Sequence, residues 1–177
     1  MLRLLTGQRQ RNLSLADKKK KFFKQFFSSD FHEWILDNKY YERAFRILVE
    51  SFNGQVLDFF LNNKSVVFIK ANGRLSCALS SLEKYHVVII FPDLCQIFES
   101  ASPMRGVAIL AHELGHIYYN HSAQTILPLK AQLEADAFTA SLGLGSDLQD
   151  VLLDYPKSEE CRIRAEYMTS LMTVKDN

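Results

Sequence analysis

Residues His112 to His116 read His-Glu-Leu-Gly-His, and this stretch constrains the fold and the chemistry of the 177-residue chain more tightly than any other. On a helix, positions four apart lie on one face about 6 Å from each other, so His112 and His116 can offer ring nitrogens to one metal ion. Glu113 lies beside that face, where it can reach a water at the metal and take its proton. The spacing predicts a metal-dependent hydrolase with zinc ligands His112 and His116 and catalytic base Glu113.

The residues around this motif predict a buried helix. Ser102-Pro103 is typical of a helix start, because serine caps the first turn and proline fits the first helical position. The residues that follow are almost continuously apolar from Val107 to Ile117. Buried histidines and carboxylates need partners, and a bound metal would satisfy them. Gly115 has no side chain, so another element can pack closely behind the metal.

Composition favours one globular domain over residues 1–177, since 47% of the residues are hydrophobic and the length suffices for a core. The three cysteines, Cys77, Cys95 and Cys161, are widely spaced and odd in number, which argues against a disulfide framework and for a reducing, cytoplasmic location. No apolar stretch is long enough to cross a bilayer or to serve as a secretory signal.

Charge is unevenly distributed along the chain. Residues 1–24 hold eight Lys/Arg against Asp17 alone, although the net charge of the chain is only +1. Within the segment 1–28, Leu15 and four phenylalanines recur at near-helical spacing among the lysines, which predicts a basic amphipathic helix. We expect this helix to dock its phenylalanines on its own domain rather than to lie on an anionic membrane, and we expect no nucleic-acid partner.

The order of the remaining elements predicts an α+β fold, mainly helical, with a small antiparallel or mixed sheet next to the metal helix. Asn72-Gly73 is typical of a two-residue hairpin turn between strands. Apolar patterning and helix breaks give the other elements: helices at 31–38, 41–52 and 55–62, hairpin strands at 65–71 and 74–79, a strand at 86–91, and helices at 94–100, 129–142, 147–154 and 158–172.

The third protein ligand distinguishes the classes of zinc peptidase. A metzincin would carry glycine and histidine where this chain has Tyr119 and Ser122, so that class is excluded. In gluzincins the third ligand is a glutamate on a second helix, four residues before an aspartate that hydrogen-bonds to a ligand histidine. The predicted helix at 129–142 is the candidate for that second helix.

The chain resembles the HtpX and CAAX-prenyl-protease family of zinc peptidases and its small soluble relatives, the minigluzincins. Besides the metal motif, the matching features are His121, Ala-Asp-Ala-Phe at 135–138, Leu142-Gly143, a late turn with Tyr155-Pro156, and Arg162-Ile163. The match covers residues 66–172, nearly the whole of the predicted catalytic core at 65–172. It implies a zincin-like fold, a Zn²⁺ cofactor and hydrolysis of peptide bonds in protein or peptide substrates. The membrane-spanning helices of the family have no counterpart here.

The chain departs from the family at the third ligand, where Gln132 replaces the glutamate and a glutamate occurs instead at Glu134. In a regular helix Gln132 shares a face with Asp136, while Glu134 lies about 160° away and points to solvent. Gln132 is therefore the favoured ligand, with Glu134 as the alternative. The resemblance implies that Asp136 and His121 support the ligand histidines from behind.

Two other classes share parts of this pattern. A regulatory metallopeptidase of the ImmA/IrrE type would have one protein target and little activity on generic peptides. A catalytically inactive zincin-fold binding protein would retain no zinc, with Gln132 marking a lost ligand. In the hydrolase interpretation, the predicted strand at 86–91 would bind extended substrate along its edge.

Overall fold

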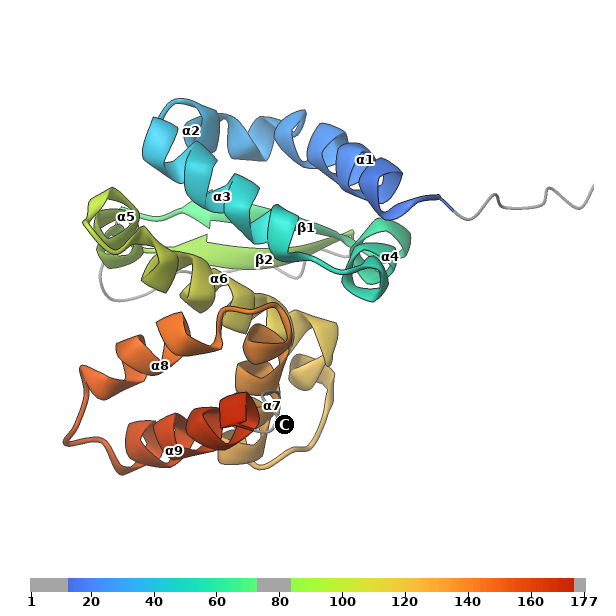
Figure 1. Ribbon diagram of the computed structural model, residues 1–177. Helices are drawn as coiled ribbons and strands as arrows, with labels where there is room; N and C mark the ends of the chain where they lie inside the picture. Colours follow the sequence, from blue (N-terminus) through green and yellow to red (C-terminus); the bar gives the residue numbers. More distant parts are fainter. Residues whose placement is uncertain (1–12, 73–83, 174–177) are drawn as a thin grey trace, which may run out of the picture.

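The computed structural model describes residues 13–72 and 84–173 and is mainly helical with a small two-stranded sheet, as predicted at that level (Figure 1). Two short 3₁₀ turns, η1 and η2, interrupt the longer elements. The described elements are α1 (Leu15–Phe27), η1 (Asp30–His32), α2 (Glu33–Leu36), α3 (Lys39–Ser51), α4 (Gly54–Asn62), β1 (Ser65–Lys70), β2 (Tyr85–Ile90), α5 (Pro92–Glu99), α6 (Pro103–Tyr118), η2 (His121–Ala123), α7 (Pro128–Ser141), α8 (Gly145–Leu153) and α9 (Glu159–Thr173).

Local sequence signals account for where the helices begin. The side chain of Asn38 accepts a hydrogen bond from the Tyr40 amide at the start of α3, and Asn53 does the same for two amides of α4. Pro103 occupies the first turn of α6 as predicted, whereas the Ser102 side chain makes no capping bond. The predicted helices therefore agree with the observed ones to within a few residues at each end.

The sheet differs from the prediction, because β1 and β2 are parallel. Their register pairs Ser65 with Tyr85 and Lys70 with Ile90. The expectation of an antiparallel or mixed sheet is wrong for these two strands. Parallel neighbours need a connection that returns the chain to the same end of the sheet, which a two-residue turn cannot provide. The predicted hairpin strand at 74–79 lies outside the described residues.

The outer edge of β1 is closed by side chains from η1 and α2. The Phe68 amide donates to His32 Nε2 at 3.1 Å, and Trp34 Nε1 donates to the Phe68 carbonyl at 3.2 Å. His32 Nδ1 lies 2.8 Å from the Phe26 carbonyl oxygen at the end of α1. His32 is buried, and its neutral ring uses both nitrogens to connect the end of α1 with β1 from its place in η1.

Helix α1 docks on the domain through its phenylalanines. Phe26 is buried, and its ring contacts the rings of Phe45 and Phe68 with centroids 5.7 Å apart in both cases. Two lysines beside this aromatic face pair with acidic residues of α3 and α4: Lys19 with Glu50 and Lys18 with Asp58. The helix therefore packs a row of phenylalanines against the core, and two of its lysines form ion pairs within the domain.

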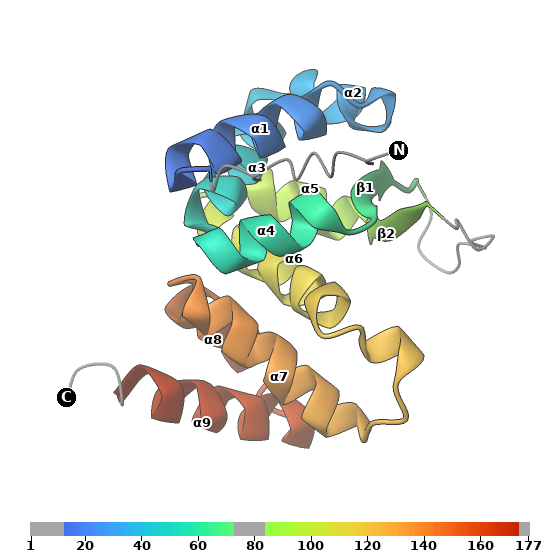
Figure 2. The ribbon, with the colours of Figure 1, turned by 90° about the vertical axis from the view of Figure 1, so that its right-hand side faces the viewer.

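Helix α6 runs through the middle of the molecule, with the sheet and α1 to α5 on one side and α7 to α9 on the other (Figures 1 and 2). Its buried residues include the apolar run predicted from the sequence and His112. In the part of the chain that is described, no helix combines the length and the hydropathy that crossing a bilayer requires. The central position of α6 presents one of its faces to α7 and another to β2.

Candidate metal centre

The candidate centre lies where α6 and α7 come unusually close. A Cβ atom on Gly115 would lie 2.9 Å from Ala135 Cα, so only glycine allows this approach. The prediction that Gly115 admits a closely packed element is confirmed. The contact brings the face of α7 that carries Gln132 and Asp136 against the histidines of α6.

Three potential metal-ligand atoms converge between the two helices. His112 Nε2 lies 3.1 Å from His116 Nε2, and Gln132 Oε1 lies 2.9 Å from His112 Nε2. His112 is buried, and His116 and Gln132 are half-buried. The two histidines and the favoured third residue thus form one cluster.

A buried ion pair holds His112 from behind. His112 Nδ1 lies 2.9 Å from Asp136 Oδ1, and Arg164 of α9 donates to both oxygens of Asp136 at 2.8 Å. Burial alone would raise the pKa of Asp136, but hydrogen bonds from Arg164 and His112 outweigh it, so the pKa lies below its ordinary value. Asp136 is therefore an anion and accepts the Nδ1 proton of His112.

A second chain of contacts holds His116. Its Nδ1 lies 2.8 Å from His121 Nδ1, and His121 Nε2 lies 2.9 Å from Glu134 Oε2. Asn120, with φ 54°, adopts the left-handed conformation that turns the chain after α6 and sets the buried His121 beside His116. Glu134 thus does not point to open solvent as expected, but binds the histidine that supports His116.

The hydrogen-bond partners assign the protons on these rings. Glu134 accepts only, so His121 carries its proton on Nε2 and accepts at Nδ1 from His116. Asp136 likewise takes the Nδ1 proton of His112. The Nε2 atoms of His112 and His116 face each other at 3.1 Å, and Gln132 Oε1 lies 2.9 Å from that of His112. A metal ion bound between these atoms would take a lone pair from each of them.

The donor set fits zinc in type and in spacing. With Zn–N bonds of about 2.0 Å, a tetrahedral centre places two ligand atoms roughly 3.3 Å apart, close to the observed separation of the two Nε2 atoms. Burial first, and then the neighbouring rings of His112 and His121, lower the pKa of His116 to about 4. His116 is therefore neutral at physiological pH, the state in which imidazole binds metals.

The third position of the set is an amide rather than a carboxylate. Over residues 13–72 and 84–173, no group of three or more His, Cys, Asp or Glu side chains is arranged to hold a metal ion. The cluster here combines two histidines with the carbonyl oxygen of Gln132. An amide oxygen is a weaker zinc ligand than a carboxylate, so the support behind the histidines matters more.

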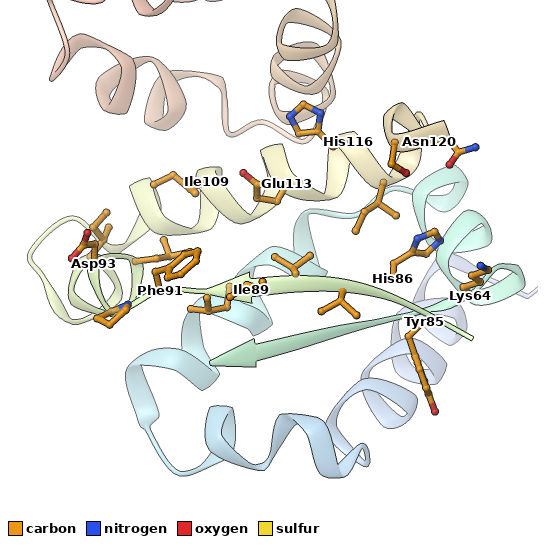
Figure 3. A pocket seen from close by; sticks show the side chains of 18 of the residues that line it. Lys64, Tyr85, His86, Ile89, Phe91, Asp93, Ile109, Glu113, His116 and Asn120 are labelled. Carbon is orange, nitrogen blue, oxygen red and sulfur yellow. The ribbon is translucent and has the colours of Figure 1, made fainter. Parts of the chain in front are cut away.

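A cleft of about 1380 Å³ opens on the other face of α6, between that helix and β2. Glu113 and His116 line it from α6, and the whole of β2 lines it from the sheet (Figure 3). Glu113 is exposed, unlike the flanking His112 and Leu114, so it projects into solvent-filled space. The base candidate and one of the metal-ligand candidates, His116, thus line the same cleft.

Arg164 is the site residue that the sequence interpretation missed. The family pattern drew attention to Arg162, which is exposed, whereas Arg164 makes the bidentate contact with Asp136. A buried aspartate on α7 requires a cation, and that requirement was the available signal. Tyr155 of the late turn also lines the cleft.

No family model, no curated protein and no solved structure matches this chain.

Proposed function

We propose that this protein is a zinc-dependent metalloendopeptidase of the gluzincin type. The observation that carries the proposal is the convergence of the Nε2 atoms of His112 and His116, 3.1 Å apart, with Gln132 Oε1 2.9 Å from that of His112. These three atoms would hold the ion. Zinc bound there would act as a Lewis acid on a peptide carbonyl and would lower the pKa of a water molecule.

Glu113 would act as the general base and then as the general acid. It lies one residue beyond His112 on α6 and lines the cleft together with His116. Its carboxylate would take a proton from the attacking water and pass it to the leaving amine. Asp136 and His121 would keep the ligand rings oriented, since each bonds to the Nδ1 atom of one ring.

The second edge of β2 supports an extended peptide as substrate. Among the described strands, only β1 pairs with β2, and β2 lies between β1 and the cleft (Figure 3). A six-residue strand spans roughly 20 Å, enough to pair with several peptide groups on either side of a scissile bond. Backbone pairing of this kind reads main chain more than side chains, which favours cleavage within a chain.

The test combines metal analysis with a peptidase assay on the full chain. We expect the purified protein to retain zinc, and we expect it to cleave a mixed-sequence peptide library until a chelator removes the metal. Glu113→Gln should abolish cleavage and leave zinc content unchanged, because an amide cannot accept the proton. Glu166→Gln, on the exposed side of α9, is the matched control and should cleave normally.

Undiminished cleavage by Glu113→Gln would remove Glu113 from the mechanism. Zinc retention without cleavage of any peptide in the library would overturn the general peptidase and favour a regulatory enzyme with one protein target. A wild-type chain that holds no zinc would overturn the metal centre itself and leave an inactive zincin-fold binding protein.

A further inference from the structure

The proposed zinc site lacks a negative charge among its direct ligands. As zinc ligands, His112 and His116 would bind as neutral rings, and Gln132 would contribute an uncharged amide oxygen. Two carboxylates lie further out: Asp136 contacts His112 directly, and Glu134 reaches His116 through His121. The two carboxylates differ in the cations beside them, and this difference determines which carboxylate contributes a net negative charge near the metal.

The charge of Asp136 is cancelled locally. Arg164 binds both of its oxygens at 2.8 Å, and the aspartate is fully buried. In the described part of the chain, no arginine pairs with Glu134. The cation that the structure places near it is Lys130, whose Nζ lies 3.8 Å from Oε1 and whose side chain is 66% exposed and screened by solvent.

Glu134 is linked to the ligand His116 by a continuous path. Its Oε2 accepts from His121 Nε2 at 2.9 Å, and His121 Nδ1 accepts from His116 Nδ1 at 2.8 Å. The linking ring is 8% exposed, so the path lies out of bulk water. A chain of hydrogen bonds that ends in an anion polarises each member toward the metal side.

We infer that Glu134, acting through His121, is a positioning residue that supplies His116 with the negative charge that Gln132 does not bring to the metal. This inference rests on the proposed zinc site. The carboxylate stands two positions from Gln132 in the sequence and on the other side of His116 in space. The negative charge of Glu134 thus lies two hydrogen bonds away from His116. From there it strengthens His116 as a ligand and fixes its tautomer.

The test measures metal affinity rather than catalysis. Zinc and cobalt affinities of the full chain would be measured by competition with a chromophoric chelator, and the visible spectrum of the cobalt form would report the direct ligands. Glu134→Gln keeps an oxygen that can accept from His121 but removes the charge. We expect it to weaken metal binding by about 10-fold, within the range found when outer partners of ligand histidines are lost.

Three further variants separate charge from geometry. His121→Phe removes the whole path and should weaken binding more, by about 10- to 100-fold. Gln132→Glu places a carboxylate on the metal directly and should tighten binding. In the Gln132→Glu background, Glu134→Gln should cost less than it does in the wild type. Glu166→Gln, an exposed change on α9, is the control and should leave affinity unchanged.

The cobalt spectrum of Glu134→Gln should keep the shape of the wild-type spectrum, since no direct ligand changes. A changed spectrum would make Glu134 a ligand itself and overturn the inference. An unchanged affinity of Glu134→Gln, or an equal loss in both backgrounds, would overturn it as well. Circular dichroism and thermal unfolding of each variant would separate loss of the site from loss of the fold.

These outcomes are distinct from failure of the proposed function. Affinity losses without any peptide hydrolysis would uphold the inference and refute the peptidase. Hydrolysis that requires Glu113, with metal affinity indifferent to Glu134, would uphold the peptidase and refute the inference. A wild-type chain that binds neither zinc nor cobalt would refute both.

Discussion

Gly115 of α6 faces Ala135 of α7 at a distance that leaves no room for a methyl group on residue 115. We expect Gly115→Ala to destabilise the protein by about 1–3 kcal/mol, because the added carbon meets main-chain atoms and forces the helices apart. Metal affinity should fall as well, since Gln132 moves away with α7. Urea unfolding and chelator competition would measure the two effects.

The matched control is Gly54→Ala at the start of α4, where a Cβ would lie 4.0 Å from the flexible end of Lys18. That change should be neutral or slightly stabilising, because alanine restricts the unfolded chain. Equal stability of the Gly54 and Gly115 variants would show that the close approach of α6 and α7 carries no energetic weight.

Arg164 is expected to be more important for stability than Arg162. Arg164→Met would leave the buried carboxylate of Asp136 without its guanidinium partner, at a cost of about 3–5 kcal/mol. Arg162→Met changes an exposed side chain and should alter stability by less than about 0.5 kcal/mol. Chemical denaturation at pH 7 would compare them. Similar losses in the two variants would contradict the pairing.

His32 is expected to make stability depend on pH. Burial, opposed only in part by its bond to the Phe26 carbonyl, lowers the pKa of His32 below its ordinary value of 6.5. The unfolded chain then binds a proton more readily, so the contribution to stability is present above about pH 6.5 and is lost as the pH falls toward the lowered pKa. Urea midpoints between pH 8 and pH 5 would follow it.

Glutamine offers the control for this titration, because it carries a donor and an acceptor and does not ionise near neutral pH. His32→Gln should be less stable than the wild type at pH 8, where the native ring packs and bonds best, but its midpoint should fall less on acidification. A pH profile parallel to that of the wild type would assign the dependence to other groups.

The phenylalanine face of α1 should stabilise the domain. Phe26→Ala removes a buried ring from the cluster with Phe45 and Phe68 and should cost about 3–5 kcal/mol. Leu15→Ala, at a position that is 49% exposed in the same helix, should cost far less. Thermal unfolding compares the two. Equal losses, together with salt-sensitive binding of the wild type to anionic vesicles, would favour a membrane role for the face.

Local signals made most helices predictable, whereas long-range pairing did not follow from them. Asn53 and Pro103 mark helix starts by bonding or shape within one turn of chain. The parallel register of Lys70 with Ile90 depends on residues far apart in sequence. The turn signal at Asn72-Gly73 favoured a hairpin, and no local pattern indicated that β1 and β2 pair directly.

The part of the candidate site that lies on a single helix was predictable from the sequence. The spacing of His112 and His116 fixes their common face whatever surrounds them. Arg162 and Arg164 stand two residues apart in α9 and hence point in nearly opposite directions, so the rotation of the helix selects between them. Tertiary packing sets that rotation. For the same reason, the contact between Glu134 and His121 could not be predicted from the sequence.

The closure of the β1 edge by His32 and Trp34 has a consequence for behaviour at high concentration. An unpaired strand edge invites another copy to add a strand, which is a common start of aggregation. At Phe68 both main-chain groups are already bonded to these side chains, so another chain finds neither donor nor acceptor there. Loss of the two side chains would therefore leave the amide and the carbonyl of Phe68 unpaired at the edge of β1, and the protein would self-associate more readily.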